Sequence, residues 1–216
     1  MSAREEVLAR LRAARDAGAP ATTPGPVVRD YLRKGAHSRG SAGAVGLLAE
    51  RIEDYRATVT RAPSPLELPD VLARLLADAG SVVVPPGIDR GWLVGCTAAV
   101  RVDREPEPVG VGELDGVDAV LTTGAVAVAE TGTLVLDATD PAQGRRVLTL
   151  VPDHHVCVVD TRDVVGTLPE ALVLLDPLHP LTFISGPSAT SDIEMDRVEG
   201  VHGPRRLDVV LVAGIS

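Results

Sequence analysis

The chain contains little cysteine, lysine or aromatic side chain, and each shortage narrows the chemistry available to it. Cys96 and Cys157 are its only cysteines, whereas an iron–sulfur cluster normally takes four thiolates. We therefore expect no cofactor in this chain, and any redox centre on another one. Lys34 is the only lysine, which excludes a Gly-Lys-Ser/Thr phosphate-binding loop and disfavours Schiff-base catalysis. A GxGxxG motif is also missing, which disfavours a standard dinucleotide-binding fold.

Aromatic residues make up 2% of the chain, so the core must be built from Val and Leu. The chain has 21 basic and 30 acidic residues, for a formal net charge of -9. Nucleic-acid recognition usually needs a basic surface and aromatic platforms, so nucleic acid is excluded as a partner. Hydrophobic residues reach 45%, which indicates a folded domain.

No apolar run is long enough to span a bilayer, and the charged N-terminal stretch lacks the apolar core of a signal peptide. We therefore expect a soluble, cytoplasmic protein without a membrane span. We divide the chain into an N-terminal helical lead-in and linker (1–40) and an α/β domain (41–216). Within the lead-in, residues 2–16 have helical spacing, and 17–27 form a linker rich in Pro, Gly and Thr.

The remaining pattern alternates helices with short apolar runs, which is typical of an α/β layered domain. Helices are predicted over 41–59, 68–79 and 168–174, with another beginning near Thr190. Strands are predicted over 81–84, 119–122, 132–137, 148–151, 156–160, 181–185 and 207–212. The central runs carry Val and Leu on both faces, as in a mostly parallel sheet that is buried on both sides.

The densest polar segment is ISGPSATSDIEMDRVEGVHGP, residues 184–204. A strand followed by Ser-Gly-Pro-Ser and a helix start can bind a phosphate or carboxylate, since ligands of open α/β sheets lie beyond carboxyl ends of strands. The alternative is an ordinary capped turn. The candidate ligand-binding residues here are Ser185, Gly186, Ser188, Asp192, Glu194 and Gly203. His202 is a candidate base, ligand or anion contact, and the alternative is a loop histidine bonded to backbone.

A second polar segment, Asp153-His154-His155, precedes a predicted strand. Adjacent strand residues face opposite ways, so both histidines cannot easily bind one metal ion. Asp153 and His155 are therefore weak metal candidates, with Glu194 or His202 as possible further ligands. Cys157, within the same strand, is expected to be a small core residue.

A third segment, Glu130-Thr131-Gly132-Thr133, lies between two apolar runs. Glu130 is a candidate nucleophile or base if burial raises its pKa, and the alternative is a turn residue. Thr131, Gly132 and Thr133 are candidate ligand contacts.

Three blocks in this order, AVAETGTLVL, VPDHHVCVV and the 184–204 segment, resemble the LUD-domain family over about residues 45–212. The resemblance implies a Rossmann-like sheet similar to those of ribose-5-phosphate isomerase, glucosamine-phosphate deaminase and the CoA transferases. It also implies a role in oxidation of L-lactate to pyruvate beside cysteine-rich iron–sulfur partner proteins. It assigns no chemistry to the matching residues, although Glu130-Thr131-Gly132 is similar to the Glu-x-Gly of CoA transferases.

Three functions stay open at this point, so the sequence does not decide whether the chain is an enzyme. The first is a non-catalytic or co-catalytic subunit of an iron–sulfur L-lactate utilization system, without its own cluster. The second is an independent transferase or isomerase acting on a small anionic substrate, such as a phosphate, carboxylate or CoA ester, with Glu130 as nucleophile or base. The third is a module that binds lactate at an anion-binding loop without turnover.

Overall fold

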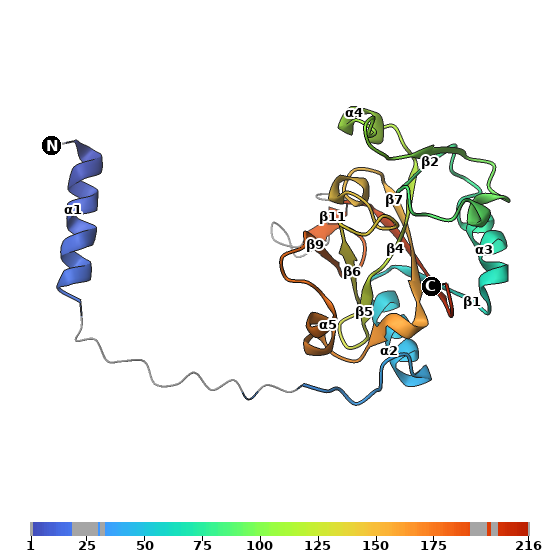
Figure 1. Ribbon diagram of the computed structural model, residues 1–216, viewed down its shortest axis with the longest axis horizontal. Coiled ribbons are helices and arrows are strands. Elements are labelled where there is room, and N and C mark those ends of the chain that lie inside the picture. Colours follow the sequence, from blue (N-terminus) through green and yellow to red (C-terminus); the bar gives the residue numbers. More distant parts are fainter. Residues whose placement is uncertain (1, 19–29, 31–32, 191–197, 200–202, 216) are drawn as a thin grey trace. The chain divides into compact units, whose positions relative to one another are not determined.

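The computed structural model describes residues 2–18, 30, 33–190, 198–199 and 203–215 (Figure 1). The chain divides into two units, Met1–Tyr31 and Leu32–Ser216. The first unit contains helix α1 (Ala3–Asp16), which confirms the predicted helix, and Ser2 caps it through a reciprocal pair of hydrogen bonds with Glu5. The predicted linker lies almost entirely outside the described residues, and the predicted boundary at residue 40 stays a prediction.

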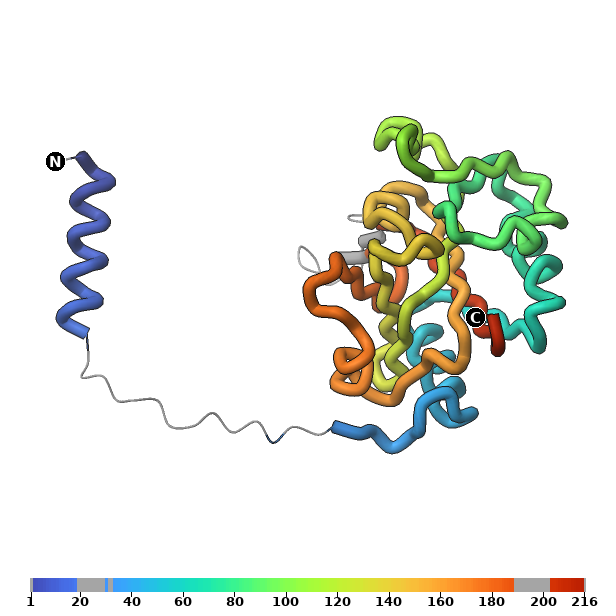
Figure 2. Tube along the Cα trace, in the orientation of Figure 1, coloured from blue at the N-terminus to red at the C-terminus, as the bar shows by residue number. Residues whose placement is uncertain are grey.

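A six-stranded parallel sheet forms the centre of the second unit, in the order β1-β12-β7-β4-β2-β3. Its strands are β1 (Thr58–Ala62), β2 (Ser81–Val84), β3 (Ala99–Val102), β4 (Ala119–Thr123), β7 (His154–Asp160) and β12 (Arg206–Val212). The last strand lies between β1 and β7 (Figure 2). Every residue of β7 is buried, as expected for a parallel strand covered on both faces.

A smaller four-stranded sheet has the order β8-β5-β6-β9. Its strands are β5 (Val126–Val128), β6 (Thr133–Asp137), β8 (Val164–Val165) and β9 (Leu181–Ile184). Strand β6 is antiparallel to both of its neighbours. A short antiparallel ribbon pairs β10 (Ala189–Thr190) with β11 (Val198–Glu199).

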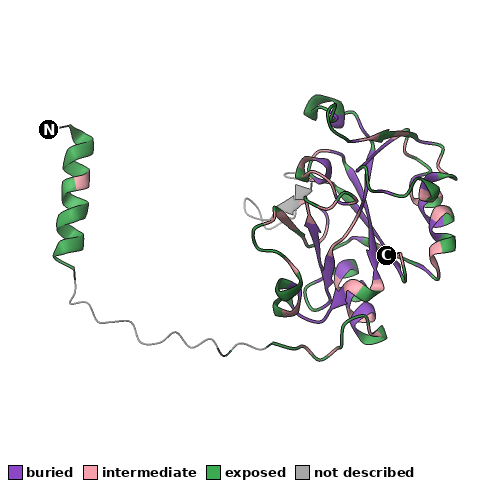
Figure 3. Ribbon diagram, viewed as in Figure 1, coloured by how far each residue is buried: buried purple, intermediate pink, exposed green. Residues whose placement is uncertain are grey.

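Helices and the smaller sheet cover the two faces of the parallel sheet, and its central strands are coloured as buried in Figure 3. The contacts on both faces are made mainly by aliphatic side chains. On one face, α2 (Ala42–Asp54) and the smaller sheet share a core with Cys157 and Val209. On the other face, α3 (Leu68–Leu75) packs against residues of β2, β4, β7 and β12. The remaining helical elements are α4 (Val111–Leu114), α5 (Leu168–Leu174), η1 (Pro65–Glu67), η2 (Arg90–Leu93), η3 (Arg146–Thr149) and η4 (Thr161–Asp163). No helix in the described part of the chain is long and apolar enough to cross a membrane.

Two predicted elements were wrong, and a third, the helix over 41–59, was confirmed but ends earlier than predicted. The helix over 41–59 ends at Asp54, because Arg56 adopts a positive φ of 66° and the chain enters β1. The strand over 148–151 is instead the end of helix η3 and the turn after it, and Leu148 is buried against Val83 and Val120 of the parallel sheet. A helix does not begin near Thr190, since Ala189–Thr190 pair as a strand with Val198–Glu199.

Candidate functional site

A cavity of about 300 Å³ lies at the amino-terminal end of β7 and β12, and we call it the amino-end pocket. Its lining residues are Arg146, Thr149, Leu150, His155, Thr182, Phe183, Ile184, Ser185, Gly186, Pro187, Ser188, Gly203, Pro204 and Leu207. The predicted residues Ser185, Gly186, Ser188 and Gly203 are therefore brought together in one wall. The Ser-Gly-Pro-Ser turn follows the carboxyl end of β9, but it lies at the amino end of the parallel sheet.

The Ser-Gly-Pro-Ser turn is held in place by close backbone packing. Gly186 has a φ of 85°, and a Cβ atom there would lie 2.6 Å from Tyr55 Cβ, so a side chain cannot be accommodated without movement. The Ser188 amide donates a hydrogen bond of 2.8 Å to the Pro204 carbonyl. This bond joins the turn after β9 to the Gly203-Pro204 turn before β12.

A chain of three hydroxyl groups connects the ETGT segment to this pocket. Thr131 Oγ1 lies 2.7 Å from Thr133 Oγ1, which lies 2.8 Å from Ser185 Oγ. Between the two threonines, Gly132 has a φ of 60°, and a Cβ atom there would lie 2.9 Å from the backbone of Arg51. Thr131 and Thr133 are thus indirect neighbours of the pocket, and only Ser185 of this chain of hydroxyls lines it.

His155 contributes an uncharged imidazole to the pocket. The residue is 1% exposed, and its Nε2 lies 2.8 Å from Thr122 Oγ1. Burial, with a smaller contribution from adjacent His154, lowers the pKa of His155 to about 3, so the ring is neutral at pH 7. His154 lies on the opposite face of β7, as strand alternation requires, and its Nε2 is 2.6 Å from Asp208 Oδ2.

Glu130 does not line the amino-end pocket. Its side chain is exposed, and its amide donates a hydrogen bond of 3.0 Å to the Gly166 carbonyl. The carboxylate lies toward Gly35, since a Cβ atom on that glycine would be 3.4 Å from Glu130 Oε1. The structure therefore places the predicted nucleophile in a different neighbourhood from Ser185 and His155.

The two metal candidates are not brought together. Asp153 is exposed and forms an ion pair of 3.3 Å with Arg205, whereas His155 is buried in the pocket wall. Among the described residues, no group of three or more His, Cys, Asp or Glu side chains is arranged to hold a metal ion. Asp192, Glu194 and His202 lie outside the described residues, so their predicted roles stay predictions.

Sequence reasoning missed much of the pocket lining, including Arg146, Leu150, Phe183 and Leu207. The adjacent pair Arg145-Arg146 was the available signal for a cationic contact. Arg145 is committed to the buried carboxylate of Asp103, at 2.6 Å, while Arg146 lines the pocket. Phe183 and Leu207 belong to predicted apolar strands, and no neighbouring motif distinguishes them from core residues.

Comparison with known proteins agrees with the three sequence blocks. Residues 112–212 match the model of the LUD domain. Lactate utilization protein C from Deinococcus radiodurans is 48% identical over 167 residues, which are 76% of this chain and 76% of that protein. The chain belongs to the LUD-domain family. All three sequence blocks fall within the matched residues of the LUD domain, which confirms the predicted resemblance.

Two further comparisons extend this result. A crystal structure of a DUF162 family protein from Deinococcus radiodurans is 41% identical and covers 80% of this chain and 98% of that one, with a TM-score of 0.66. Uncharacterized protein NMB1437 from Neisseria meningitidis serogroup B is 29% identical over 99% of this chain and 94% of its own length. The mixed α/β architecture with a mostly parallel sheet is therefore similar to that of a solved LUD-type structure.

Proposed function

We propose that this chain is a subunit of an iron–sulfur-dependent L-lactate utilization system and that its amino-end pocket binds a small carboxylate such as lactate. The lining of that pocket is the observation that carries the proposal. Arg146 supplies a guanidinium group, which pairs well with carboxylates, and Ser185 and Ser188 supply hydroxyl groups. Leu150 and Phe183 supply apolar surface for a methyl group, and the volume of about 300 Å³ suits a small ligand.

The neutral ring of His155 favours binding over proton abstraction. A pKa of about 3 makes the imidazole a weak base at pH 7, so it is poorly matched to removing a proton from lactate. Its bond to Thr122 occupies Nε2, which makes Nδ1 the nitrogen that a ligand would meet. We therefore assign His155 a positioning role, and His202 stays the candidate base.

The electrons of lactate would leave through clusters on cysteine-rich partner proteins. This chain has two cysteines, and burial raises the pKa of the Cys157 thiol to about 12, as for an ordinary core thiol. The name of the Deinococcus radiodurans relative, Lactate utilization protein C, supports the assignment to lactate metabolism. In this proposal the chain acts in the cytoplasm together with those partners.

An independent transferase or isomerase acting on a small anion is the second candidate. We infer for the sheet a Rossmann-like arrangement similar to ribose-5-phosphate isomerase and the CoA transferases, which would suit such an enzyme. The hydroxyl chain from Thr131 through Thr133 to Ser185 favours it, because it joins the Glu130 segment to the pocket. The exposed position of Glu130, outside the pocket lining, counts against a catalytic role for this residue. Turnover of an anionic substrate that disappears in Glu130→Gln would support it over the first proposal.

Growth on L-lactate tests the leading proposal. A deletion strain should fail on L-lactate as sole carbon source, grow on glucose, and recover with the wild-type gene. Arg146→Gln should not restore growth, whereas Arg74→Gln should, because Arg74 is an exposed residue of α3 outside the pocket lining. Normal growth of the deletion strain on lactate, with no second copy of the gene, would contradict the lactate role.

A further inference from the structure

A second cavity, of about 560 Å³, lies at the opposite end of the parallel sheet. We call it the carboxyl-end pocket. Its lining includes Gly87 and Asp89 after β2, and Thr123 and Gly124 at the end of β4. It shares no described lining residue with the amino-end pocket, so the two cavities are separate.

The carboxyl-end pocket coincides with the topological switch point of the sheet. Strands β2 and β4 are neighbours, but the chain continues from β2 to β3 on one side and from β4 to β7 on the other. In open α/β sheets, diverging connections leave a crevice outside the carboxyl ends of two such strands, and ligands bind there. The cavity volume is in the range of small-molecule sites.

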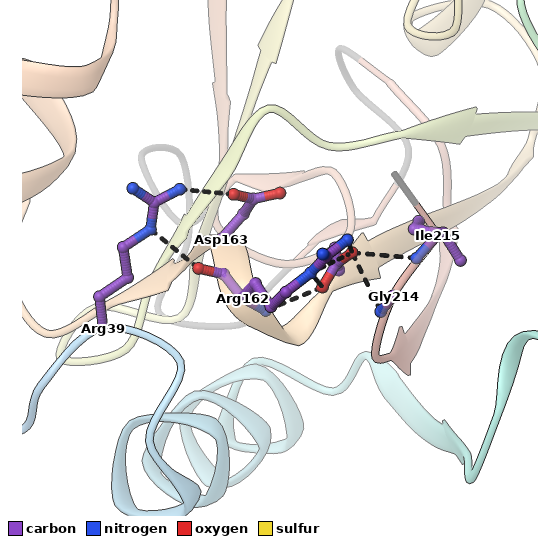
Figure 4. A network of polar contacts seen from close by, with 6 residues as sticks. Arg39, Arg162, Asp163, Gly214 and Ile215 are labelled. Atoms are coloured by element: carbon purple, nitrogen blue, oxygen red, sulfur yellow. Dashed lines mark hydrogen bonds and ion pairs between the residues drawn. The ribbon is translucent and has the colours of Figure 1, made fainter.

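One wall of this pocket is held by a network of charged groups (Figure 4). Asp160 accepts hydrogen bonds from Arg162 and from the amides of Gly214 and Ile215, at 2.6 to 3.2 Å. Burial raises the pKa of Asp160, but these hydrogen bonds outweigh it and hold the pKa well below its usual range. Arg39 similarly contacts Asp163 at 2.7 Å. The wall is therefore preformed and ionised.

The charge of the lining decides which ligands it can accept. Among the described residues, the lining holds no basic side chain and five aspartates, which are Asp89, Asp137, Asp140, Asp160 and Asp163. Arg162 and Arg39 compensate Asp160 and Asp163 through ion pairs. Asp137 lies 2.6 Å from His179 Nδ1, and this hydrogen bond raises the pKa of His179. Asp89 and Asp140 accept hydrogen bonds only from uncharged donors within the described chain. Two negative charges thus stay uncompensated, which opposes anions and attracts cations.

An aromatic side chain in the lining complements a cationic ligand. Trp92, half-buried, lines the cavity and offers an aromatic face of the kind that binds ammonium groups.

We propose that the carboxyl-end pocket binds a small organic cation with one or two ammonium groups, between Asp89, Asp140 and the ring of Trp92. This site is independent of the proposed lactate site at the other end of the sheet. The chain would then bind two ligands of opposite charge, a carboxylate at the amino-end pocket and a cation at the carboxyl-end pocket.

Trp92 makes the test direct, because it is the only tryptophan of the chain. The full chain is titrated with putrescine, a diammonium probe, while tryptophan fluorescence and heat of binding are recorded at constant ionic strength. Its uncharged analogue 1,4-butanediol is the matched control ligand. Asp89→Asn removes one carboxylate but keeps an oxygen for the Gly91 amide, and Asp78→Asn makes the same charge change on an exposed residue outside the pocket.

Saturable binding of putrescine but not 1,4-butanediol, weakened about tenfold by Asp89→Asn and unchanged by Asp78→Asn, is the expected result. Absence of a saturable signal up to about 20 mM putrescine would overturn the proposal. Equal responses to both ligands, or equal weakening by both variants, would overturn it too. Lactate binding at the amino-end pocket is measured separately, so the failure of one site leaves the other testable.

Discussion

The two ends of one parallel sheet carry opposite chemistry. At the amino end, hydroxyl groups, glycines, Arg146 and a neutral histidine line a pocket suited to an anion. At the carboxyl end, aspartates and Trp92 line a pocket suited to a cation. The LUD-domain blocks supply the amino end, whereas chain topology alone points to the carboxyl end. Sequence motifs and fold rules can therefore indicate different sites in one domain.

The largest expected effect comes from disturbing the turn that forms the amino-end pocket. Gly186→Ala places a Cβ atom against Tyr55 in a left-handed conformation, so we expect a loss of about 2–4 kcal/mol in the free energy of unfolding, measured in urea. Gly46→Ala on helix α2 is the matched control, because no atom beyond its chain neighbours and the helix's own backbone lies within 4 Å of the position that its Cβ would take, and it should be neutral or stabilising. Equal stability of the two variants would show that the turn is not constrained as described.

Lowering the pH should reduce the free energy of unfolding through His155, which lines the amino-end pocket. The unfolded histidine takes up a proton near its ordinary pKa of 6.5, whereas the folded ring stays neutral down to about 3, so stability falls as pH drops through this window. The stability advantage of wild type over His155→Gln should narrow by about 2 kcal/mol from pH 7 to pH 5.

His179→Gln is the control of opposite sign for this prediction. The hydrogen bond to Asp137 raises the pKa of His179, so its contribution is present at low pH and is lost as pH rises through the folded pKa. The advantage of wild type over this variant should grow from pH 7 to pH 5. Parallel stability curves for wild type and His155→Gln would contradict the buried, neutral state of His155.

The hydroxyl chain predicts a smaller effect that links the ETGT segment to the pocket. Thr133→Val keeps the shape of the side chain but leaves Thr131 and Ser185 without their shared partner, which should cost about 1–2 kcal/mol in urea unfolding. Thr131→Val, at the exposed end of the chain, should cost clearly less. A larger loss of stability in Thr131→Val than in Thr133→Val would contradict the central position of Thr133 among the three hydroxyl groups.

The smallest effect is expected at the carboxyl end. Asp89→Asn retains the oxygen that accepts from the Gly91 amide and removes one uncompensated charge, so stability should change by no more than about 0.5 kcal/mol, with any gain largest at low salt. A loss above about 1 kcal/mol would mean that Asp89 stabilises the fold and is not simply available to a ligand.

The sequence predicted best those elements whose burial is two-sided. Strand β2 has the predicted bounds, and β4, β7 and β12 differ by one or two residues, because their Val- and Leu-rich runs are unambiguous. Helix α5 also has the predicted bounds, although Ala171 is its only buried residue. Strand β1 was missed because Thr58–Ala62 is a partly exposed edge strand with no apolar run. Strand β5 was missed because its three residues, Val126–Val128, are too few to form a recognisable apolar run.

The lining of the amino-end pocket was predicted where short motifs mark it and missed where it comes from distant residues without a motif, and the roles of these residues stay predictions. Ser185, Gly186, Ser188, Gly203 and His155 do line one pocket. Glu130 does not, because the turn that carries it faces Gly35 and Gly166. The position of Arg146 depends on how helix η3 packs through Leu148 against Val83 and Val120 of the parallel sheet, which the local sequence does not indicate.

The most direct test of the account is calorimetric titration of L-lactate into the full chain and its arginine variants. Saturable binding to wild type and Arg74→Gln, weakened at least about tenfold in Arg146→Gln, is the predicted result. Binding that is unaffected by Arg146→Gln, or absent from wild type, would contradict an anion site at the amino end of the sheet.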